Sequence, residues 1–370
     1  MSANVHGDPA RTNAFAADPI PSGFTPWRFR AGGWDNRLGA PVVSDGFVYV
    51  CSDHGHLHAL DALTGKPRWV FTAERGLWGP APVVSDGIVC FSDPNGTVYA
   101  VGREDGQLRW KARGDYAVSL VAGGGVVYGA DSSAVLRGVT HDQLFAWDAE
   151  TGEELWSKRV DRSSTLPALA DGRLYHNGVL GYLTAFKAKT GKELYTHGSD
   201  MRNPGASNTP CVADGFVYAS AGTLLFAHET RRGEAVWASA FSNYILDCVA
   251  AANGKLYVRD RDGQISALDA ADGKVLWRQN YPTSRTPLAL HGDAGLLIAG
   301  SHGNYLYRID LATGERIWRR PLGSERASEI FVWNGIAYLT ARKKTLITVD
   351  ATTGRKRGRV RDIVGAAVAM

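Results

Sequence analysis

Two acidic residues, Asp247 and Glu329, stand in a repeated sequence near the place where most other copies carry a proline. An acid that points into a closed channel loses hydration, which raises its pKa and suits it to proton transfer. Asp247 and Glu329 are therefore the candidate catalytic residues. The alternative is a structural role, in which they form salt bridges to Arg285 or Arg326. The prolines of the other copies are Pro41, Pro82, Pro167, Pro210 and Pro287.

A set of aromatic, amide and arginine side chains lies in the connections between the repeats. Aromatic walls with a few polar groups are typical of small-molecule pockets, and arginine binds planar oxyanions through its forked donors. The set predicts a site for a mainly apolar, partly anionic small organic substrate. The alternative is that the aromatics pack beneath loops and each arginine pairs with a nearby acid. The candidate substrate-binding residues are Trp34, Arg75, Trp78, Arg113, Tyr116, Arg162, Arg202, Asn243, Tyr244, Tyr281 and Arg285.

A histidine motif, HGHLH, places His54, His56 and His58 at alternate positions. Neighbours on one face of a strand lie about 7 Å apart, too far for three imidazoles to bind one zinc at about 2 Å. The motif also coincides with the ordinary repeat pattern, so we predict no metal site. The four cysteines form no C-x-x-C pair and are predicted to be buried free thiols. No phosphate-binding or nucleophile motif is found, and no cofactor is predicted.

An internal repeat defines the elements that must carry these residues. A Gly-x-x-x-aromatic phrase recurs at spacings of 39 to 46 residues, and an apolar stretch with a turn such as Asp-Gly precedes each copy. Asp-Gly and Asn-Gly favour two-residue hairpins because they accept positive φ. Four short strands per unit at about 40-residue spacing predict a β-propeller. The eight anchoring pairs are Gly65/Trp69, Gly106/Trp110, Gly152/Trp156, Gly191/Tyr195, Gly233/Trp237, Gly273/Trp277, Gly314/Trp318 and Gly354/Gly358.

The phrase A-x-D-x-x-T-G-x-x-x-W, clearest at Ala59–Trp69, Ala146–Trp156 and Ala267–Trp277, resembles the tryptophan-docking repeat of the pyrroloquinoline-quinone-like eight-bladed propellers. The resemblance covers about residues 25 to 360 and implies that each tryptophan stacks on the neighbouring blade. The family includes quinoprotein dehydrogenases, an outer-membrane assembly lipoprotein and kinase sensor domains, so it does not specify an activity. Its quinone-dependent members have adjacent cysteines and calcium-binding acids. This chain has no Cys-Cys pair, which implies a member without the quinone and calcium site.

The last copy lacks its aromatic residue, because Gly358 stands in that place. The N-terminal stretch FTPWRFRAGG resembles a fourth strand, and its Trp27 lies 42 residues before Trp69. We predict that this strand completes the last blade and closes the ring, which removes open sheet edges. The alternative makes Arg359–Ile363 the fourth strand. The predicted units are a flexible N-terminal extension (1–24), one all-β eight-bladed propeller domain (25–362) and a C-terminal tail (363–370).

Strand connectivity decides which face of the ring varies. In a four-stranded meander the first and third turns emerge on one face, and here these turns are short and alike. The second loops and the crossovers between blades emerge on the other face and vary in length and content. Functional residues concentrate on such loops above a rigid scaffold. The candidate pocket is therefore placed on this second face, which we call the crossover face.

Composition and the N-terminal sequence limit the partners. A net charge of +4 over 370 residues indicates neither nucleic acid nor a membrane as partner. The chain shows no apolar leader and no run of about 18 apolar residues, which favours a cytoplasmic location.

We predict a cofactor-independent enzyme of cyclase, lyase or isomerase type that acts on a small molecule by positioning and proton transfer. The alternative is a noncatalytic scaffold or ligand sensor that binds a peptide, glycan or protein on the same face.

Overall fold

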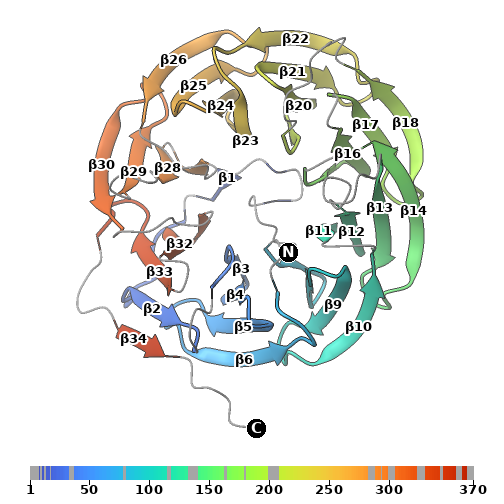
Figure 1. Cartoon of the computed structure of the whole chain (residues 1–370). Helices are drawn as coiled ribbons and strands as arrows, with labels where there is room; N and C mark the ends of the chain where they lie inside the picture. Colours follow the sequence, from blue (N-terminus) through green and yellow to red (C-terminus); the bar gives the residue numbers. More distant parts are fainter. Residues whose placement is uncertain are drawn as a thin grey trace.

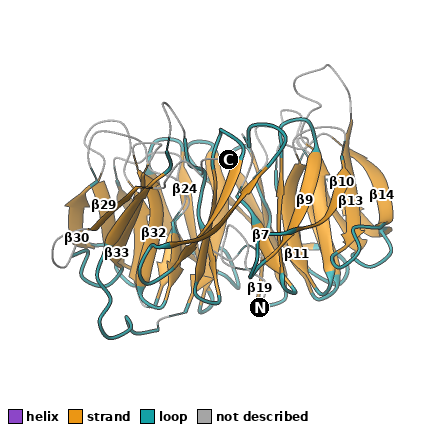
Figure 2. Cartoon of the chain, turned by 90° about the horizontal axis from the view of Figure 1, so that it is seen from below, coloured by secondary structure: helices purple, strands orange, loops and turns teal. Residues whose placement is uncertain are grey.

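Eight sheets form a ring in the computed structural model of the chain (Figure 1). Seen from the side, the strands run between two faces that carry loops and turns (Figure 2). None of the described segments forms a helix long and apolar enough to cross a membrane. The structure describes residues 8, 11, 14–16, 18–32, 37–77, 81–114, 118–131, 141–161, 165–178, 181–198, 208–281, 288–292, 294–298, 305–322, 330–341, 345–355 and 361–364.

Each sheet is one blade, and we number the blades 1 to 8 from β3 onward. The innermost strands are β3 (Val42–Ser44), β7 (Val83–Ser85), β11 (Val118–Gly123), β15 (Ala168–Ala170), β19 (Cys211–Ala213), β23 (Ile245–Ala252), β27 (Ala289–His291) and β31 (Phe331–Trp333). The second strands are β4 (Phe47–Cys51), β8 (Ile88–Ser92), β12 (Val126–Asp131), β16 (Arg173–Asn177), β20 (Phe216–Ala221), β24 (Lys255–Asp260), β28 (Ala294–Ile298) and β32 (Ile336–Ala341).

The third strands are β5 (His56–Asp61), β9 (Thr97–Gly102), β13 (His141–Asp148), β17 (Leu183–Lys187), β21 (Leu224–Glu229), β25 (Gln264–Asp269), β29 (Tyr305–Asp310) and β33 (Thr345–Asp350). The outer strands are β6 (Pro67–Thr72), β10 (Leu108–Arg113), β14 (Glu154–Asp161), β18 (Lys192–His197), β22 (Ala235–Ala240), β26 (Val275–Asn280), β30 (Arg316–Pro321) and β2 (Trp27–Arg30). Two sheets have a fifth strand: β1 (Ala14–Phe15) extends blade 7, and β34 (Arg361–Val364) extends blade 8.

The turns between the first and second strands have the backbone that their sequence predicts. In blade 1, Asp45 and Gly46 both have positive φ, of 48° and 82°. A two-residue hairpin of this type requires positive φ at both central positions, which Asp or Asn followed by Gly accepts. The predicted hairpins are thus confirmed. The same pair of positive φ angles recurs at Asp86–Gly87, Asp171–Gly172, Asp214–Gly215, Asn253–Gly254 and Asn334–Gly335.

The turn between the third and outer strands is stabilised by its aspartate. In blade 1 the Oδ1 atom of Asp61 accepts hydrogen bonds from the backbone N–H and the hydroxyl of Thr64. The glycine that follows has positive φ, and in blade 2 a Cβ atom on Gly106 would lie 2.6 Å from the Trp69 ring. Glycine is therefore required twice, for its backbone angle and for the approach of a tryptophan from the preceding blade.

The aromatic ring of each outer strand docks on the next blade, as the resemblance implies. Each indole N–H, or the Tyr195 hydroxyl in blade 4, donates a hydrogen bond to a backbone carbonyl in that blade's turn. This contact links neighbouring sheets at the rim. The donor and acceptor pairs are Trp27–Ala62, Trp69–Arg103, Trp110–Ala149, Trp156–Ala188, Tyr195–Thr230, Trp237–Ala270, Trp277–Leu311 and Trp318–Thr352.

The N-terminal strand closes the ring. Strand β2 pairs antiparallel with β33, so that Arg28 lies opposite Ile347, and Trp27 is only 1% exposed. The Trp27 indole N–H donates to the carbonyl of Ala62 in blade 1 at 3.0 Å. Strand β34 lies outside β2 and runs parallel to it. The prediction that Trp27 returns the docking residue is confirmed, and the alternative is wrong because the C-terminal strand is the fifth strand of blade 8.

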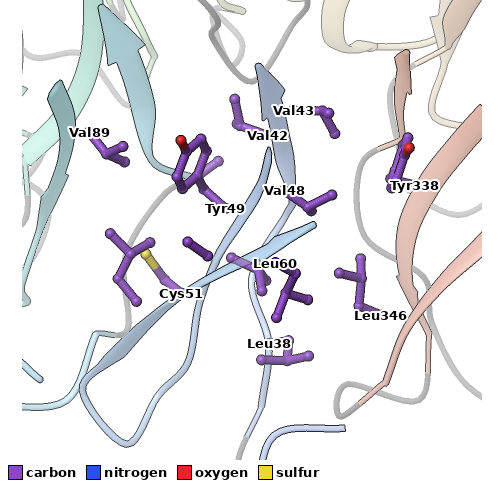
Figure 3. Close-up of a cluster of buried hydrophobic side chains, with 14 of the residues drawn as sticks. Leu38, Val42, Val43, Val48, Tyr49, Cys51, Leu60, Val89, Tyr338 and Leu346 are labelled. Atoms are coloured by element: carbon purple, nitrogen blue, oxygen red, sulfur yellow. The ribbon is translucent and has the colours of Figure 1, made fainter. Parts of the chain in front are cut away.

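A hydrophobic cluster fills the junction between blades 8 and 1. Figure 3 shows Tyr338 and Leu346 of blade 8 facing side chains of blade 1 such as Val48 and Leu60, and all four are fully buried. Cys51 lies in the same cluster, where burial raises the pKa of its thiol to about 12 and keeps it protonated. Cys90 and Cys211 are also buried free thiols, which confirms the prediction for these three residues, and the side chain of Cys248 lies outside the described part.

The described residues of the N-terminal extension pack inside and beneath the ring. We call those from Asp8 to Pro26 the N-terminal strap. Its strand β1 pairs in parallel with β27 and lies inside the ring of blades (Figure 1), and Arg11 is fully buried. Ile20 lies against Gly335 in a turn of blade 8. Backbone pairing at Ala14 and Phe15 and the burial of Arg11 place these residues against the ring, whereas Ser22 and Gly23 are exposed. The flexibility of the extension over 1–24 stays a prediction.

Candidate functional site

The predicted pocket on the crossover face lies largely in segments that are not described. The side chains of both candidate catalytic acids, Asp247 and Glu329, fall outside the described part of the chain. The backbone of Asp247 lies in β23, the innermost strand of blade 6, where the pairing with β24 is interrupted between Leu246 and Ala250. The proton-transfer role therefore stays a prediction. The candidate substrate-binding residues outside the described part are Trp34, Trp78, Tyr116, Arg162, Arg202 and Arg285.

The other predicted pocket residues belong to two distant parts of the ring. Arg75 and Arg113 are exposed, at the end of blades 1 and 2 respectively. Asn243 and the 41% exposed Tyr244 follow β22 of blade 5, and the Asn243 side-chain oxygen accepts a hydrogen bond from the Tyr244 backbone. In Figure 1 the outer strands β6 and β10 lie on the opposite side of the ring from β22. The described residues of the set therefore form two groups and not one wall.

Tyr281 is a core residue, which corrects its assignment to the pocket. Its side chain is only 9% exposed, and its ring makes an edge contact with Tyr307 at 5.6 Å. The hydroxyl donates a hydrogen bond to the carbonyl of Gly314 in blade 7 at 2.7 Å, and burial raises its pKa. The sequence did not distinguish this residue from a ligand-facing aromatic because it follows β26 in a crossover. Its role is to attach blade 6 to blade 7.

The histidine motif forms part of a packed strand. His58 is 7% exposed and contacts Phe29 of the closing strand edge to face, at 5.1 Å between ring centroids. Burial lowers its pKa to about 4, so it is neutral at pH 7. His56 makes a hydrogen bond with Thr72 on the neighbouring strand. Among the described residues, no three side chains of the histidine, cysteine or acidic type gather into a group that could hold a metal.

The central channel contains the N-terminal strap. The Arg11 guanidinium donates hydrogen bonds to the carbonyl of Leu120 in blade 3, at 2.9 Å, and to that of Pro167 in blade 4, at 3.3 Å. Four residues further on, Phe15 makes an edge contact with Phe331 of blade 8, with centroids 4.9 Å apart. The strap therefore connects inner strands on different sides of the ring. A funnel from the crossover face would meet these two side chains inside the ring.

The outer strands show a second feature, in the distribution of charge. An open sheet edge is a template for pairing with another chain, and proteins protect such edges with charged side chains. Seven of the outer strands carry at least one arginine, lysine, aspartate or glutamate, as in β6, where Arg68 pairs with Asp61. In blade 2, Arg109 pairs with Asp105 and Lys111 with Glu74. Strand β22 of blade 5 has the sequence AVWASA and carries no charge.

Strand β22 is fixed on one side and open on the other. It pairs with β21, and its Trp237 and Ser239 side chains donate hydrogen bonds to carbonyls of blade 6. Its Ala235 and Ala238 are exposed, and Val236 is 53% exposed. In the described part of the chain no strand pairs with its outer edge, whereas β34 covers the equivalent edge of β2 in blade 8. Blade 5 therefore presents an uncharged, unprotected sheet edge at the rim.

This edge was missed at the level of sequence, although a signal for it exists. Once the outer strands are aligned on their docking aromatic, AVWASA is the copy without charge. The strap gave no such signal, because Arg11 and Phe15 lie outside the repeat. Their partners in the ring are more than 100 residues away.

These features define an eight-bladed propeller of the tryptophan-docking type, closed by its own N-terminal strand. The family model described as outer membrane protein assembly factor BamB, a model of PQQ-type repeats, matches residues 13–121, 94–203 and 180–367. The chain belongs to this family. No cofactor-binding residue follows from membership, since the fold hosts unrelated functions.

Several curated proteins are similar in sequence. The serine/threonine-protein kinase AfsK of Streptomyces griseus is 34% identical over 275 residues, which are 70% of this chain and 32% of the kinase. BamB of Bordetella pertussis is 27% identical over 321 residues, with 81% of this chain and 79% of that protein covered. The chain spans about a third of the kinase, a fifth of a matching quinohemoprotein alcohol dehydrogenase from Comamonas testosteroni and 60% of BamB of Moranella endobia.

Solved structures share the fold. The crystal structure of BamB from Moraxella catarrhalis superposes with a TM-score of 0.71 at 17% identity, covering 87% of this chain and 97% of that one. The quinohemoprotein alcohol dehydrogenase of Comamonas testosteroni gives a TM-score of 0.70 at 14% identity, covering 97% and 81%. At these identities the likeness concerns the fold alone. An assembly factor and an enzyme thus share one ring, and function must be argued from this chain's surfaces.

Proposed function

We propose that this protein is a noncatalytic propeller scaffold that binds a partner polypeptide at the outer edge of blade 5. The observation that carries the proposal is the uncharged, exposed strand β22 in a ring whose other outer strands carry charges. The binding mode is strand addition, in which an extended segment of the partner pairs with the free backbone groups of β22. Each backbone hydrogen bond so formed contributes about 1 kcal/mol.

The exposed side chains of β22 fit this mode. Val236 is 53% exposed and the neighbouring alanines are small, so a partner strand can approach the backbone without displacing long side chains. Burial of apolar area contributes roughly 25 cal/mol per Å², which favours covering Val236. Tyr244, 41% exposed beyond the end of β22, extends the apolar surface toward the crossover face. The same ring already accepts a fifth strand at the equivalent edge of blade 8.

The family relationship supports a scaffold over an enzyme. BamB proteins, named as assembly factors, align with this chain over most of its length in Bordetella pertussis. The N-terminal strap crosses the channel into which the predicted catalytic funnel would open. The cyclase, lyase or isomerase hypothesis depends on acids whose side chains lie outside the described part. The scaffold depends on described residues alone.

Site-specific photo-crosslinking tests the proposal. A photoreactive amino acid replaces Ala238 in β22, and in a second protein it replaces Arg278, the exposed residue at the same position of blade 6. After irradiation in the native cell, we expect position 238 to crosslink one defined polypeptide and position 278 to give none. Adding Val236→Lys should abolish the crosslink, because it places a charge on the edge.

The folded state should not change in these variants. Val236 and Ala238 are exposed, and substitutions at such sites alter the free energy of unfolding by about 0.5 kcal/mol or less. Unfolding curves of the variants provide this control. Equal crosslinking at positions 238 and 278, or crosslinking that survives Val236→Lys, would show that β22 is not the binding edge.

A further inference from the structure

Arg11 is held in the channel as a ligand would be held. Its side chain is fully buried, and its guanidinium donates to two backbone carbonyls from different blades, those of Leu120 and Pro167. Arg11 itself has a φ of 65°, and its N–H donates to the carbonyl of Asp8, so the chain turns at this residue. The turn delivers the side chain between blades 3 and 4. Hydrogen bonds from a charged donor contribute more than neutral ones and need exact placement of the acceptors.

Phe15 is held by the opposite side of the ring. It lies beside His291 in the parallel pairing of β1 with β27, and its ring contacts Phe331. Its side chain packs against two hydrophobic clusters, one at the junction of blades 8 and 1 and one between blades 7 and 8. The ring thus supplies an acceptor pair for a cation, the edge of β27 for backbone pairing and an apolar contact for an aromatic.

Backbone pairing at a sheet edge, together with pockets for particular side chains, is one way in which proteins recognise peptides. We propose that the central channel is a binding site for a polypeptide segment with an arginine four residues before a phenylalanine, and that the chain's own N-terminal strap occupies this site. A second polypeptide with the same spacing then competes with the strap. This site is separate from β22, so either proposal can fail without the other.

The connection between the strap and the ring explains why the site is filled. From Phe15 the chain runs beneath blade 8, past Gly335 and through an exposed turn at Ser22 and Gly23, before β2 begins at Trp27. A short connection of this kind gives the tethered segment an effective concentration on the order of millimolar. Even a site of modest affinity is occupied under that condition. A free peptide therefore competes well only when the tether is cut or the anchors are removed.

The test cuts the tether in the 370-residue chain. A recognition sequence for a specific protease is inserted between Ser22 and Gly23, where both residues are exposed. After cleavage we expect the N-terminal fragment to stay with the ring in gel filtration. A fluorescent peptide of residues 8–18 should then replace it with saturable binding. Far-ultraviolet circular dichroism before and after cleavage shows that the ring remains folded.

Peptide variants show which contacts hold the ligand. Loss of the two guanidinium hydrogen bonds in an Arg11→Ala peptide should weaken binding tenfold or more. A peptide in which the arginine and the phenylalanine exchange places keeps the composition and serves as the matched control, and it should not bind. The uncut variant with Arg11→Ala and Phe15→Ala should bind the native peptide more tightly than the uncut wild-type protein does, because its own strap competes less.

Three results would overturn the proposal. The fragment could leave the ring at once and the labelled peptide fail to bind, which would mean that the channel has no affinity for this sequence. The fragment could resist exchange entirely, which would make it a permanent part of the fold. The Arg11→Ala peptide could compete as well as the native peptide, and then the acceptor pair would not be a recognition element.

Discussion

Replacement of Trp27 by alanine should destabilise the protein more than replacement of any single docking residue elsewhere. The Trp27 side chain is 1% exposed, and removal of a buried tryptophan costs about 3–5 kcal/mol. The lost hydrogen bond adds little, because the carbonyl of Ala62 also accepts from the Tyr338 hydroxyl at 3.1 Å and keeps a partner. We therefore expect a loss of about 4 kcal/mol in the free energy of unfolding.

The matched control is Trp318→Ala in blade 7. Trp318 makes the same kind of contact, with its indole N–H on the carbonyl of Thr352, but its side chain is only partly buried. It also lies in β30, which pairs with β29, the strand directly before it in sequence. Trp27 by contrast closes the ring through a contact between residues 321 apart, as its backbone N–H donates to the Thr348 hydroxyl. We expect Trp318→Ala to cost about half as much.

Urea unfolding followed by circular dichroism measures both effects. Trp27→Phe keeps an aromatic ring at this position and should cost less than Trp27→Ala. If Trp27→Ala costs no more than Trp318→Ala, then the N-terminal strand does not close the ring, and the argument from burial and long-range pairing is refuted.

Three further predictions concern substitutions of single residues. Burial lowers the pKa of His58 to about 4, so between about pH 6.5 and pH 4 the unfolded state binds more protons than the folded state. The free energy of unfolding should therefore fall by about 1.4 kcal/mol for each pH unit of acidification in this range, and less steeply in His58→Gln. Unfolding curves at several pH values measure both slopes. Gly106→Ala should cost at least about 1 kcal/mol more than Gly87→Ala, because both have positive φ but only the first meets a tryptophan ring; equal thermal shifts would contradict this. Tyr281→Phe should lose about 1 kcal/mol with its hydrogen bond to Gly314, and a stability equal to wild type would show that this hydrogen bond does not attach blade 6 to blade 7.

The fold could be predicted from the sequence because its contacts repeat. The glycine before each outer strand has positive φ, and in blades 2 to 8 it lies close to the docking aromatic ring of the preceding blade. Both requirements appear as one phrase every 40 residues or so. The place of Trp27 followed from the same spacing, since the gap at Gly358 and the extra copy at the N-terminus complement each other. Local chemistry and ring geometry agree at these positions.

The candidate site was less predictable because its contacts do not repeat. Arg11 reaches its two carbonyl acceptors across the channel, and nothing in the residues around it indicates blades 3 and 4. Tyr281 has the composition of a pocket residue, but a single hydrogen bond to the next blade gives it a structural role. The uncharged edge of β22 was readable in AVWASA only after the outer strands had been placed at the rim.

Hydrogen–deuterium exchange of the 370-residue chain tests most directly whether the channel is filled by the chain itself. Residues 14–15 pair with β27, so peptides that cover them should exchange as slowly as peptides that cover Ala289–His291. Exchange of residues 14–15 at the rate of an unstructured peptide, while β27 remains protected, would show an open channel. That result would remove the support that the filled channel gives to the scaffold and to the peptide site.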